Sequence, residues 1–323
     1  MQTPANKPAS ALMVVIAFAT VYIVWGSTYF FIRMAIQHIP ALLMACMRFS
    51  TAGLLMLIWC AIKGEKLFVW KDIKPAIITG LILLFIGNGA VVWVEQYLSS
   101  SFVAVLAAAT PIWFVVLDKT NWRINFKSKA TIIGLLMGFA GVVLLLSENV
   151  KNSTATPTNH MQTISLFVCL IGSIAWASGS LYSKYYSSGP SSSVNTGWQM
   201  FAGGIAFIPL SFISGEWTNF HWQQVTTNSW LALFYLITMG SLAGYSAYIW
   251  LLQVRPATQV STNAYVNPVV AVLLGVFLAN EKMTPLQFAG LAIILISVLL
   301  VNLAKYRKEK QHINVPAKVA AEV

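Results

Sequence analysis

The stretch "GNGAVVWVEQYLSSSFVAVLAAATPIW", residues 87–113, occurs a second time in the chain in altered form. Shifted by 157 positions, it lies without a gap over residues 244–270, "GYSAYIWLLQVRPATQVSTNAYVNPVV". Seven of the 27 positions are identical, including a Gly, a Trp, a Gln and a Pro. A weaker match at a shift of 151 sets "WGSTYF" (25–30) over "WASGSL" (176–181). The chain therefore contains an internal repeat.

The composition around this repeat is that of a membrane protein. Of 323 residues, 58% are hydrophobic and only 9% are charged, whereas soluble domains carry about 25% charged residues. A helix needs about 20 mostly apolar residues to cross a bilayer. The chain offers ten such stretches, at residues 12–36, 41–62, 75–97, 100–119, 129–147, 163–185, 193–214, 229–253, 257–279 and 285–304.

Ten spans divide into two halves of five, residues 12–147 and 163–305, joined by a polar linker at 148–162. Tails are expected at 1–11 and 306–323. Because five is odd, the second half crosses the membrane in the opposite sense. We therefore predict an all-α integral membrane protein with ten transmembrane helices, arranged as two inverted five-helix repeats around a central cavity. Secondary transporters built this way bind substrate at the repeat interface, near the bilayer midplane.

The formal net charge of +11 sets the orientation. Sixteen of the 20 Lys and Arg residues lie in tails or gaps on the N-terminal side of the membrane, and two lie in gaps on the other side. The positive-inside rule then places both termini in the cytoplasm. This distribution argues against a nucleic-acid-binding face, and we expect the lipid bilayer and a small-molecule substrate as partners.

The fourth and ninth spans combine polar residues with a proline. Asn263 and Asn267 lie on one helical face, followed by Pro268, and Pro111 has the equivalent position in the first half. Backbone freed by proline is tolerated in a span where side chains, water or a cavity satisfy it. We predict helix breaks at both prolines and a cavity lined by the two amides. The alternative is that the amides only join neighbouring helices.

Further candidate substrate contacts occupy equivalent positions in the repeat. Asn88 in the third span matches Tyr245 in the eighth, and Tyr248 lies one turn beyond. Trp25 and Trp176 match in the first and sixth spans. We expect all five side chains to touch substrate. The alternatives are interfacial belt positions for the tyrosines and simple packing for the tryptophans.

The charges within or near the ends of predicted spans include Arg48 and Glu95. Arg48 is seven residues into the second span, and Glu95 lies near the outer end of the third. A charge at such depth usually finds an interior partner. We predict a polar gate on the extracytoplasmic side that contains both residues. A structural ion pair or a snorkelling arginine is the alternative.

The chemistry of the spans limits the substrate. All nine acids lie in loops, tails or span ends, so a carboxylate-driven cycle for cationic drugs is not expected. Amides, hydroxyls and aromatic rings suit neutral or zwitterionic molecules such as amino acids. The four histidines lie in loops or the tail without a catalytic motif, and no spacing fits a metal or a disulfide. We expect no cofactor and no bound metal.

Several short motifs in this order identify a resemblance: "WGSTYFFIR" (25–33), "RFSTAG" (48–53), "GNGAVVWVEQ" (87–96), "AAATP" (107–111), "GSIAWASGS" (172–180) and "AYVNPVVAVLLG" (264–275). Together they resemble the EamA-type transporters of the drug/metabolite transporter superfamily, and within them the YedA-like set. The resemblance covers about residues 12–305. It implies ten helices, inverted repeats, a central pocket and export of small metabolites or drugs from the bacterial cytoplasm across the inner membrane.

Rival functions remain open at this stage. Alternating access has no built-in direction, so import or exchange of a sugar, a nucleotide-type metabolite or a cofactor is the main alternative. A membrane-embedded enzyme lacks a motif, and an ion channel or signalling scaffold lacks charged rings and a soluble domain. We expect a monomer, with a homodimer as the alternative, because small-xxx-small patterns such as "GLLMG" (134–138) serve either intramolecular or dimer packing.

Overall fold

The computed structural model describes residues 9–98, 100–153, 160–187, 191–218, 220–279 and 284–319. Within these ranges every regular element is a helix, and none is a strand. Parts of the predicted tails (1–11 and 306–323) and of the predicted linker (148–162) lie outside the described residues.

The first half contains α1 (Ala11–Ile36), α2 (Ala41–Ile62), α3 (Trp70–Thr79), η1 (Gly80–Asn88), α4 (Gly89–Val94), α5 (Ser100–Ala107), α6 (Thr110–Leu117), η2 (Lys119–Asn121), α7 (Trp122–Lys127) and α8 (Lys129–Ser153). The second half contains α9 (His160–Tyr186), α10 (Ser192–Ile205), α11 (Phe207–Ile213), η3 (Trp222–Gln224), α12 (Thr227–Tyr235), η4 (Leu236–Tyr245), α13 (Ser246–Val254), α14 (Ala257–Val260), α15 (Asn263–Ala279) and α16 (Pro285–Val319).

Eight helical segments of the described chain are long and apolar enough to cross a membrane: Ala11–Ile36, Ala41–Ile62, Trp70–Val94, Lys129–Ser147, His160–Tyr186, Ser192–Ile213, Thr227–Val254 and Pro285–Asn302. They match eight of the ten predicted spans. Large apolar side chains such as Ile16 and Phe167 face outward on these segments, as expected for helices in lipid.

The predicted fourth and ninth spans are not continuous helices. Val103–Leu117 is bent by 66° against Lys119–Lys127, and counting that pair as one span gives at most nine among the described residues. α14 and α15 are separated at residues 261–262, and α15 has only 17 residues. The prediction of ten spans is therefore not confirmed.

Only one of the two predicted proline breaks is present. Pro111 is in the first turn of α6, directly after the interruption at 108–109, a position where proline's missing N–H costs nothing. Pro268 lies inside α15, so the break predicted there is wrong. The chain breaks instead at Ser261 and Thr262, whose hydroxyls donate to the carbonyls of Thr258 (3.1 Å) and Gln259 (2.7 Å).

Two long π-helical segments were not predicted. η1 has nine residues and η4 has ten, whereas π-helix normally occurs as single-turn bulges, often at functional sites. A shift of 157 positions carries η1 onto residues 237–245, which is all of η4 except its first residue. Both halves therefore depart from α-helix at the same place in the repeat.

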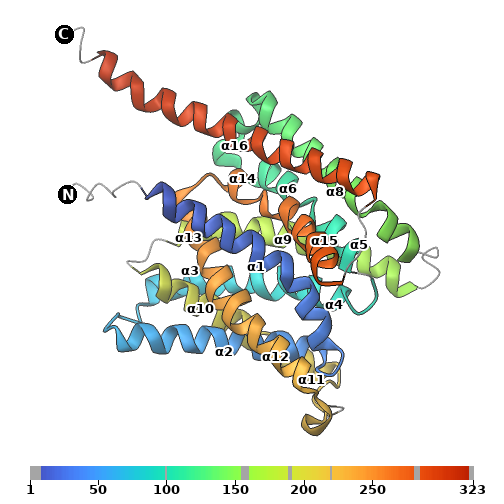
Figure 1. Ribbon diagram of the computed structural model, residues 1–323. Coiled ribbons are helices and arrows are strands. Elements are labelled where there is room, and N and C mark those ends of the chain that lie inside the picture. Colours follow the sequence, from blue (N-terminus) through green and yellow to red (C-terminus); the bar gives the residue numbers. More distant parts are fainter. Residues whose placement is uncertain are drawn as a thin grey trace.

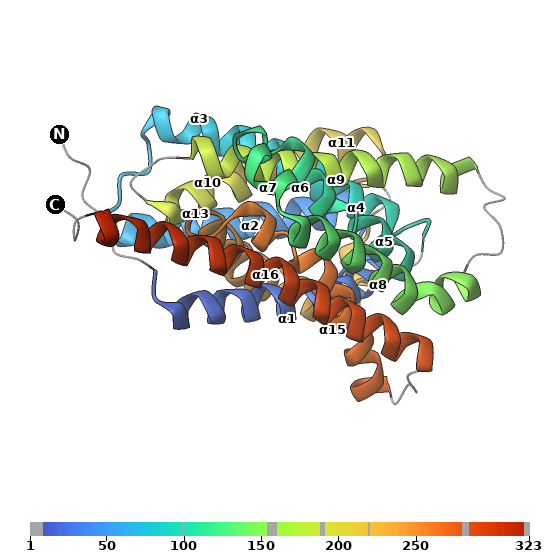
Figure 2. The same ribbon diagram turned by 90° about the horizontal axis from the view of Figure 1, so that it is seen from above.

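The helices of the two halves interlock. α1 contacts α12, η4, α13 and α15, whereas α9 contacts α3, η1, α4 and α6. α16 runs along α8, and the beginning of α1 and the end of α16 lie on the same side of the molecule (Figures 1 and 2). Each half thus packs its first helix against its partner's π-helical segment.

α2 and α10 approach each other closely through glycine. A Cβ added to Gly53 would lie 2.3 Å from the backbone nitrogen of Phe201, and one on Gly204 would lie 2.3 Å from that of Ser50. Under the shift of 151 positions, Gly53 corresponds to Gly204 and Ser50 to Phe201. The two glycines therefore make the same contact from opposite sides.

Candidate functional site

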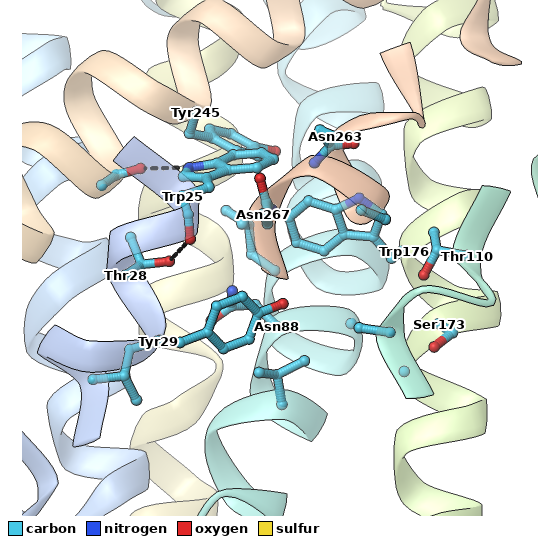
Figure 3. Close-up of a pocket in the computed structure, with 18 of the residues that line it drawn as sticks. Trp25, Thr28, Tyr29, Asn88, Thr110, Ser173, Trp176, Tyr245, Asn263 and Asn267 are labelled. Atoms are coloured by element: carbon cyan, nitrogen blue, oxygen red, sulfur yellow. Dashed lines mark hydrogen bonds between the residues drawn. The ribbon is translucent and has the colours of Figure 1, made fainter. Parts of the chain in front are cut away.

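A pocket lies where the two halves meet. Its lining comes from α1, α2, η1, α4, α5 and α6 of the first half and from α9, η4 and α15 of the second. Figure 3 shows Asn88, Asn267 and Trp176 around the same space, each from a different helix. Both π-helical segments contribute, with Asn88 at the end of η1 and Tyr245 at the end of η4.

Two tryptophans form an aromatic wall. The rings of Trp25 and Trp176 meet edge to face, with centroids 5.4 Å apart. Trp25 Nε1 donates to the carbonyl of Gly240 at 3.0 Å, and Trp176 Nε1 donates to the hydroxyl of Tyr248 at 3.0 Å. Both predicted tryptophans line the pocket, and each is fixed by one of these hydrogen bonds.

Three predicted amides also line the pocket: Asn88, Asn263 and Asn267. Oδ1 of Asn88 and Oδ1 of Asn267 are buried and have no hydrogen-bond partner among the described residues. An unpaired buried acceptor is costly unless something else supplies a donor. The break at 261–262 starts α15 at Asn263, and this start brings Asn263 and Asn267 to the cavity.

The two predicted tyrosines differ in position. Tyr245 lines the pocket, and its hydroxyl donates to Oε1 of Gln199 at 2.7 Å. Tyr248 is fully buried behind the wall, where its hydroxyl accepts from Trp176 and lies 2.7 Å from Ser180 Oγ. The prediction that Tyr248 touches substrate is therefore corrected: it supports Trp176 and is absent from the described lining.

Arg48 and Glu95 are both buried, at 3% and 5% exposure. Arg48 lines the pocket and its Nε donates to Ser241 Oγ at 3.0 Å. Arg48 Nη1 and both carboxylate oxygens of Glu95 have no hydrogen-bond partner among the described residues. The two side chains are close enough to interact electrostatically, but no hydrogen bond joins them. The alternative of a bonded ion pair is therefore not seen among the described residues, and the gate stays a prediction.

Several lining residues were not predicted as substrate contacts. Tyr29, Thr28 and Ser173 face the pocket, and Thr28 donates to the carbonyl of Trp25 at 2.7 Å (Figure 3). Tyr29 is four residues from Trp25, so both lie on one face of α1. Ser173 follows a glycine, and nothing in the sequence distinguishes it from a packing serine.

Comparison with known proteins identifies the family. The model of the EamA-like transporter family matches the chain twice, over residues 12–147 and 163–303. The chain belongs to the EamA-like transporter family. It is thereby a member of the drug/metabolite transporter superfamily, and the predicted resemblance is confirmed.

Relatives of this EamA-like chain come from bacteria and plants. It is 35% identical to "Uncharacterized inner membrane transporter YedA" of Escherichia coli (strain K12) over 90% of each chain. It is 24% identical to "Uncharacterized transporter YvbV" of Bacillus subtilis (strain 168) over 99% of each chain. A solved crystal structure that is 16% identical covers 91% of this chain and 98% of its own, with a TM-score of 0.73. That likeness concerns the fold alone.

Proposed function

We propose that this EamA-like protein is an inner-membrane exporter of small neutral or zwitterionic metabolites that works by alternating access. The observation that carries the proposal is the pocket between the halves, lined by aromatic rings and by unpaired amide oxygens. Such a lining fits an amphipathic molecule with an apolar body and hydrogen-bond donors. Membership of a transporter family and the printed name of the Escherichia coli relative support an inner-membrane location.

In alternating access, two equivalent halves move against each other around a fixed site. Three pairs of equivalent features support an inverted repeat in this chain. η1 and η4 correspond under the shift of 157 positions, and Gly53 and Gly204 correspond under the shift of 151. α1 packs against η4 as α9 packs against η1. An inverted repeat with a site at its centre can open to either side by rocking one half against the other.

The residue roles that we propose follow the pocket wall. Trp25 and Trp176 bracket the apolar part of the substrate, and Asn88 and Asn267 accept its N–H or O–H donors. Asn263 and Tyr245 complete the wall, and Tyr248 holds Trp176 from behind. Both termini lie in the cytoplasm, because the basic residues are concentrated on that side.

Metabolite profiling tests the function directly. Cells that overproduce the wild-type protein are compared with cells that produce Asn88→Ala, which removes an unpaired acceptor from the pocket. We expect one or a few small metabolites to accumulate in the medium only with the wild type. Asn228→Ala is the matched control, because Asn228 is exposed at the start of α12, outside the described lining.

Other outcomes would change the proposal. Accumulation inside the cells, lost with Asn88→Ala, would favour an importer. Identical metabolite profiles for wild type, Asn88→Ala and an empty vector would contradict transport through this pocket.

A further inference from the structure

The guanidinium of Arg48 is a buried, fixed charge on the pocket wall. Its side chain is 3% exposed, and Nη1 has no hydrogen-bond partner among the described residues. A buried charged donor normally has its hydrogen bonds satisfied, because leaving one unmade is costly. The free donor at Nη1 therefore needs a partner that the described residues do not supply.

Neighbouring residues hold this guanidinium in one position. Nε donates to Ser241 Oγ at 3.0 Å, and Cζ lies 4.7 Å from the ring centroid of Phe49. A Cβ on Gly240 would lie 3.0 Å from Nη2, so the glycine leaves room for the guanidinium beside η4. The second half thus positions an arginine that belongs to the first half.

Glu95 is the acid that interacts electrostatically with Arg48 among the described residues. Glu95, at the end of α4, interacts electrostatically with Arg33 and Arg48, and also with Tyr29 on α1 and Cys169 on α9. Arg33 is exposed, unlike Arg48. Glu95 is also not hydrogen-bonded to Arg48. An anionic group in the pocket would supply the acceptor that Nη1 lacks.

We infer that Arg48 is an anion subsite of the pocket and that it binds a carboxylate of the transported molecule. The inference rests on the proposed function and narrows the neutral or zwitterionic class to compounds that bear a carboxylate. Guanidinium and carboxylate form strong charge-assisted hydrogen bonds. Asn88 Oδ1 and Asn267 Oδ1 are free acceptors in the same pocket, and they suit an ammonium, amide or hydroxyl group elsewhere on the substrate.

Efflux of matched acids and amides tests the subsite. Purified wild-type protein is reconstituted in liposomes loaded with the common amino acids and their C-terminal amides, and release above protein-free liposomes is measured by mass spectrometry. For each transported pair we expect the acid to leave at least about tenfold faster than its amide. A factor of about ten corresponds to the free energy of one charge-assisted hydrogen bond. Arg48→Gln should abolish this preference.

Arg33→Gln is the matched control, because it removes the same charge from an exposed position of the same cluster and should keep the preference. An amide that leaves as fast as its acid, or a preference retained in Arg48→Gln, would overturn the subsite. The comparison of acid and amide efflux by the wild-type protein tests the subsite even if Arg48→Gln does not fold. Absence of release for every pair with the wild type would instead overturn the proposed export of amino-acid-like compounds, and the subsite with it.

Discussion

Tyr248 shows how a single residue shapes the pocket without lining it. Its hydroxyl accepts from Trp176 Nε1 and lies 2.7 Å from Ser180 Oγ. Its ring lies beside Trp25, with centroids 4.8 Å apart. The tryptophan wall therefore depends on one buried phenol behind it.

Tyr248→Phe should keep the packing of the ring and remove this hydrogen bond. The Trp176 N–H would then be buried and unpaired, which costs about 1–3 kcal/mol. We expect a lower unfolding midpoint in detergent and a change in tryptophan fluorescence. Tyr182→Phe, on the same helix as Trp176, is the control, because the Tyr182 hydroxyl makes no hydrogen bond to a described residue. Equal midpoints for the two variants would contradict the supporting role.

The sequence pattern predicted which residues surround the pocket better than it predicted whether each one lines the pocket or supports a lining residue. Trp25, Trp176, Asn88 and Asn267 were found because matching positions in the repeat carry polar or aromatic side chains at membrane depth. Asn263 was found because it shares a helical face with Asn267. Tyr248 lies one turn beyond Tyr245 in the sequence, but in the structure it lies behind the wall, in contact with Trp25 of α1 and with Trp176 of α9. Spacing alone cannot tell a lining residue from the one that supports it.

At the scale of elements, the crossing of α2 and α10 depends on Gly53 and Gly204. Gly53→Ala would bring a Cβ to 2.3 Å from the backbone nitrogen of Phe201, so the helices must separate. Overpacking of this kind costs about 1–3 kcal/mol. We expect lower unfolding midpoints for Gly53→Ala and for Gly204→Ala. Thr51→Ala, exposed on α2, should have no such effect, and a similar loss there would argue against the close crossing.

The start of α2 is held by a carboxylate from outside the spans. Glu216 accepts from the backbone nitrogens of Leu42 (3.2 Å) and Leu43 (2.8 Å). Burial raises the pKa of Glu216, and these two hydrogen bonds partly oppose the shift. A raised pKa means that the folded state favours the protonated acid, so its contribution to stability is present at low pH and is lost as pH rises through the folded-state pKa.

Glu216→Gln should remove this contribution to the pH dependence. As pH rises from about 4, near the ordinary pKa of Glu, toward neutral, we expect the unfolding midpoint of the wild type to fall relative to that of Glu216→Gln. The measurement is thermal unfolding in detergent across this range. Parallel curves for the two proteins would contradict a raised pKa at Glu216.

Breaks in helices were the least predictable elements. Pro111 begins a helix after an interruption, whereas Pro268 is accommodated inside α15. The actual break at Ser261 and Thr262 uses hydroxyls that bond to nearby carbonyls, a common and weak sequence signal. The π-helical segments have no sequence signature and follow from packing against α1 and α9.

For the whole molecule, the orientation in the membrane is a prediction that labelling can test. The native cysteines Cys46, Cys60 and Cys169 are buried and are first replaced. Cysteine is then introduced at Lys66, between α2 and α3, or at Thr218, between α11 and α12. In intact cells, with the outer membrane made permeable, an impermeant thiol reagent should label Thr218→Cys. Lys66→Cys should react only after the inner membrane is opened, and the reverse pattern would contradict cytoplasmic termini.

The central claim is that one pocket between the halves opens to each side of the membrane in turn. Ser173 is buried on the pocket wall, where it is 6% exposed, so in the cysteine-free background Ser173→Cys reports on access to the pocket. An impermeant thiol reagent is added to right-side-out and to inside-out vesicles, and labelling is quantified by mass spectrometry. Alternating access predicts labelling from both sides. Labelling from one side only, or from neither, would contradict it.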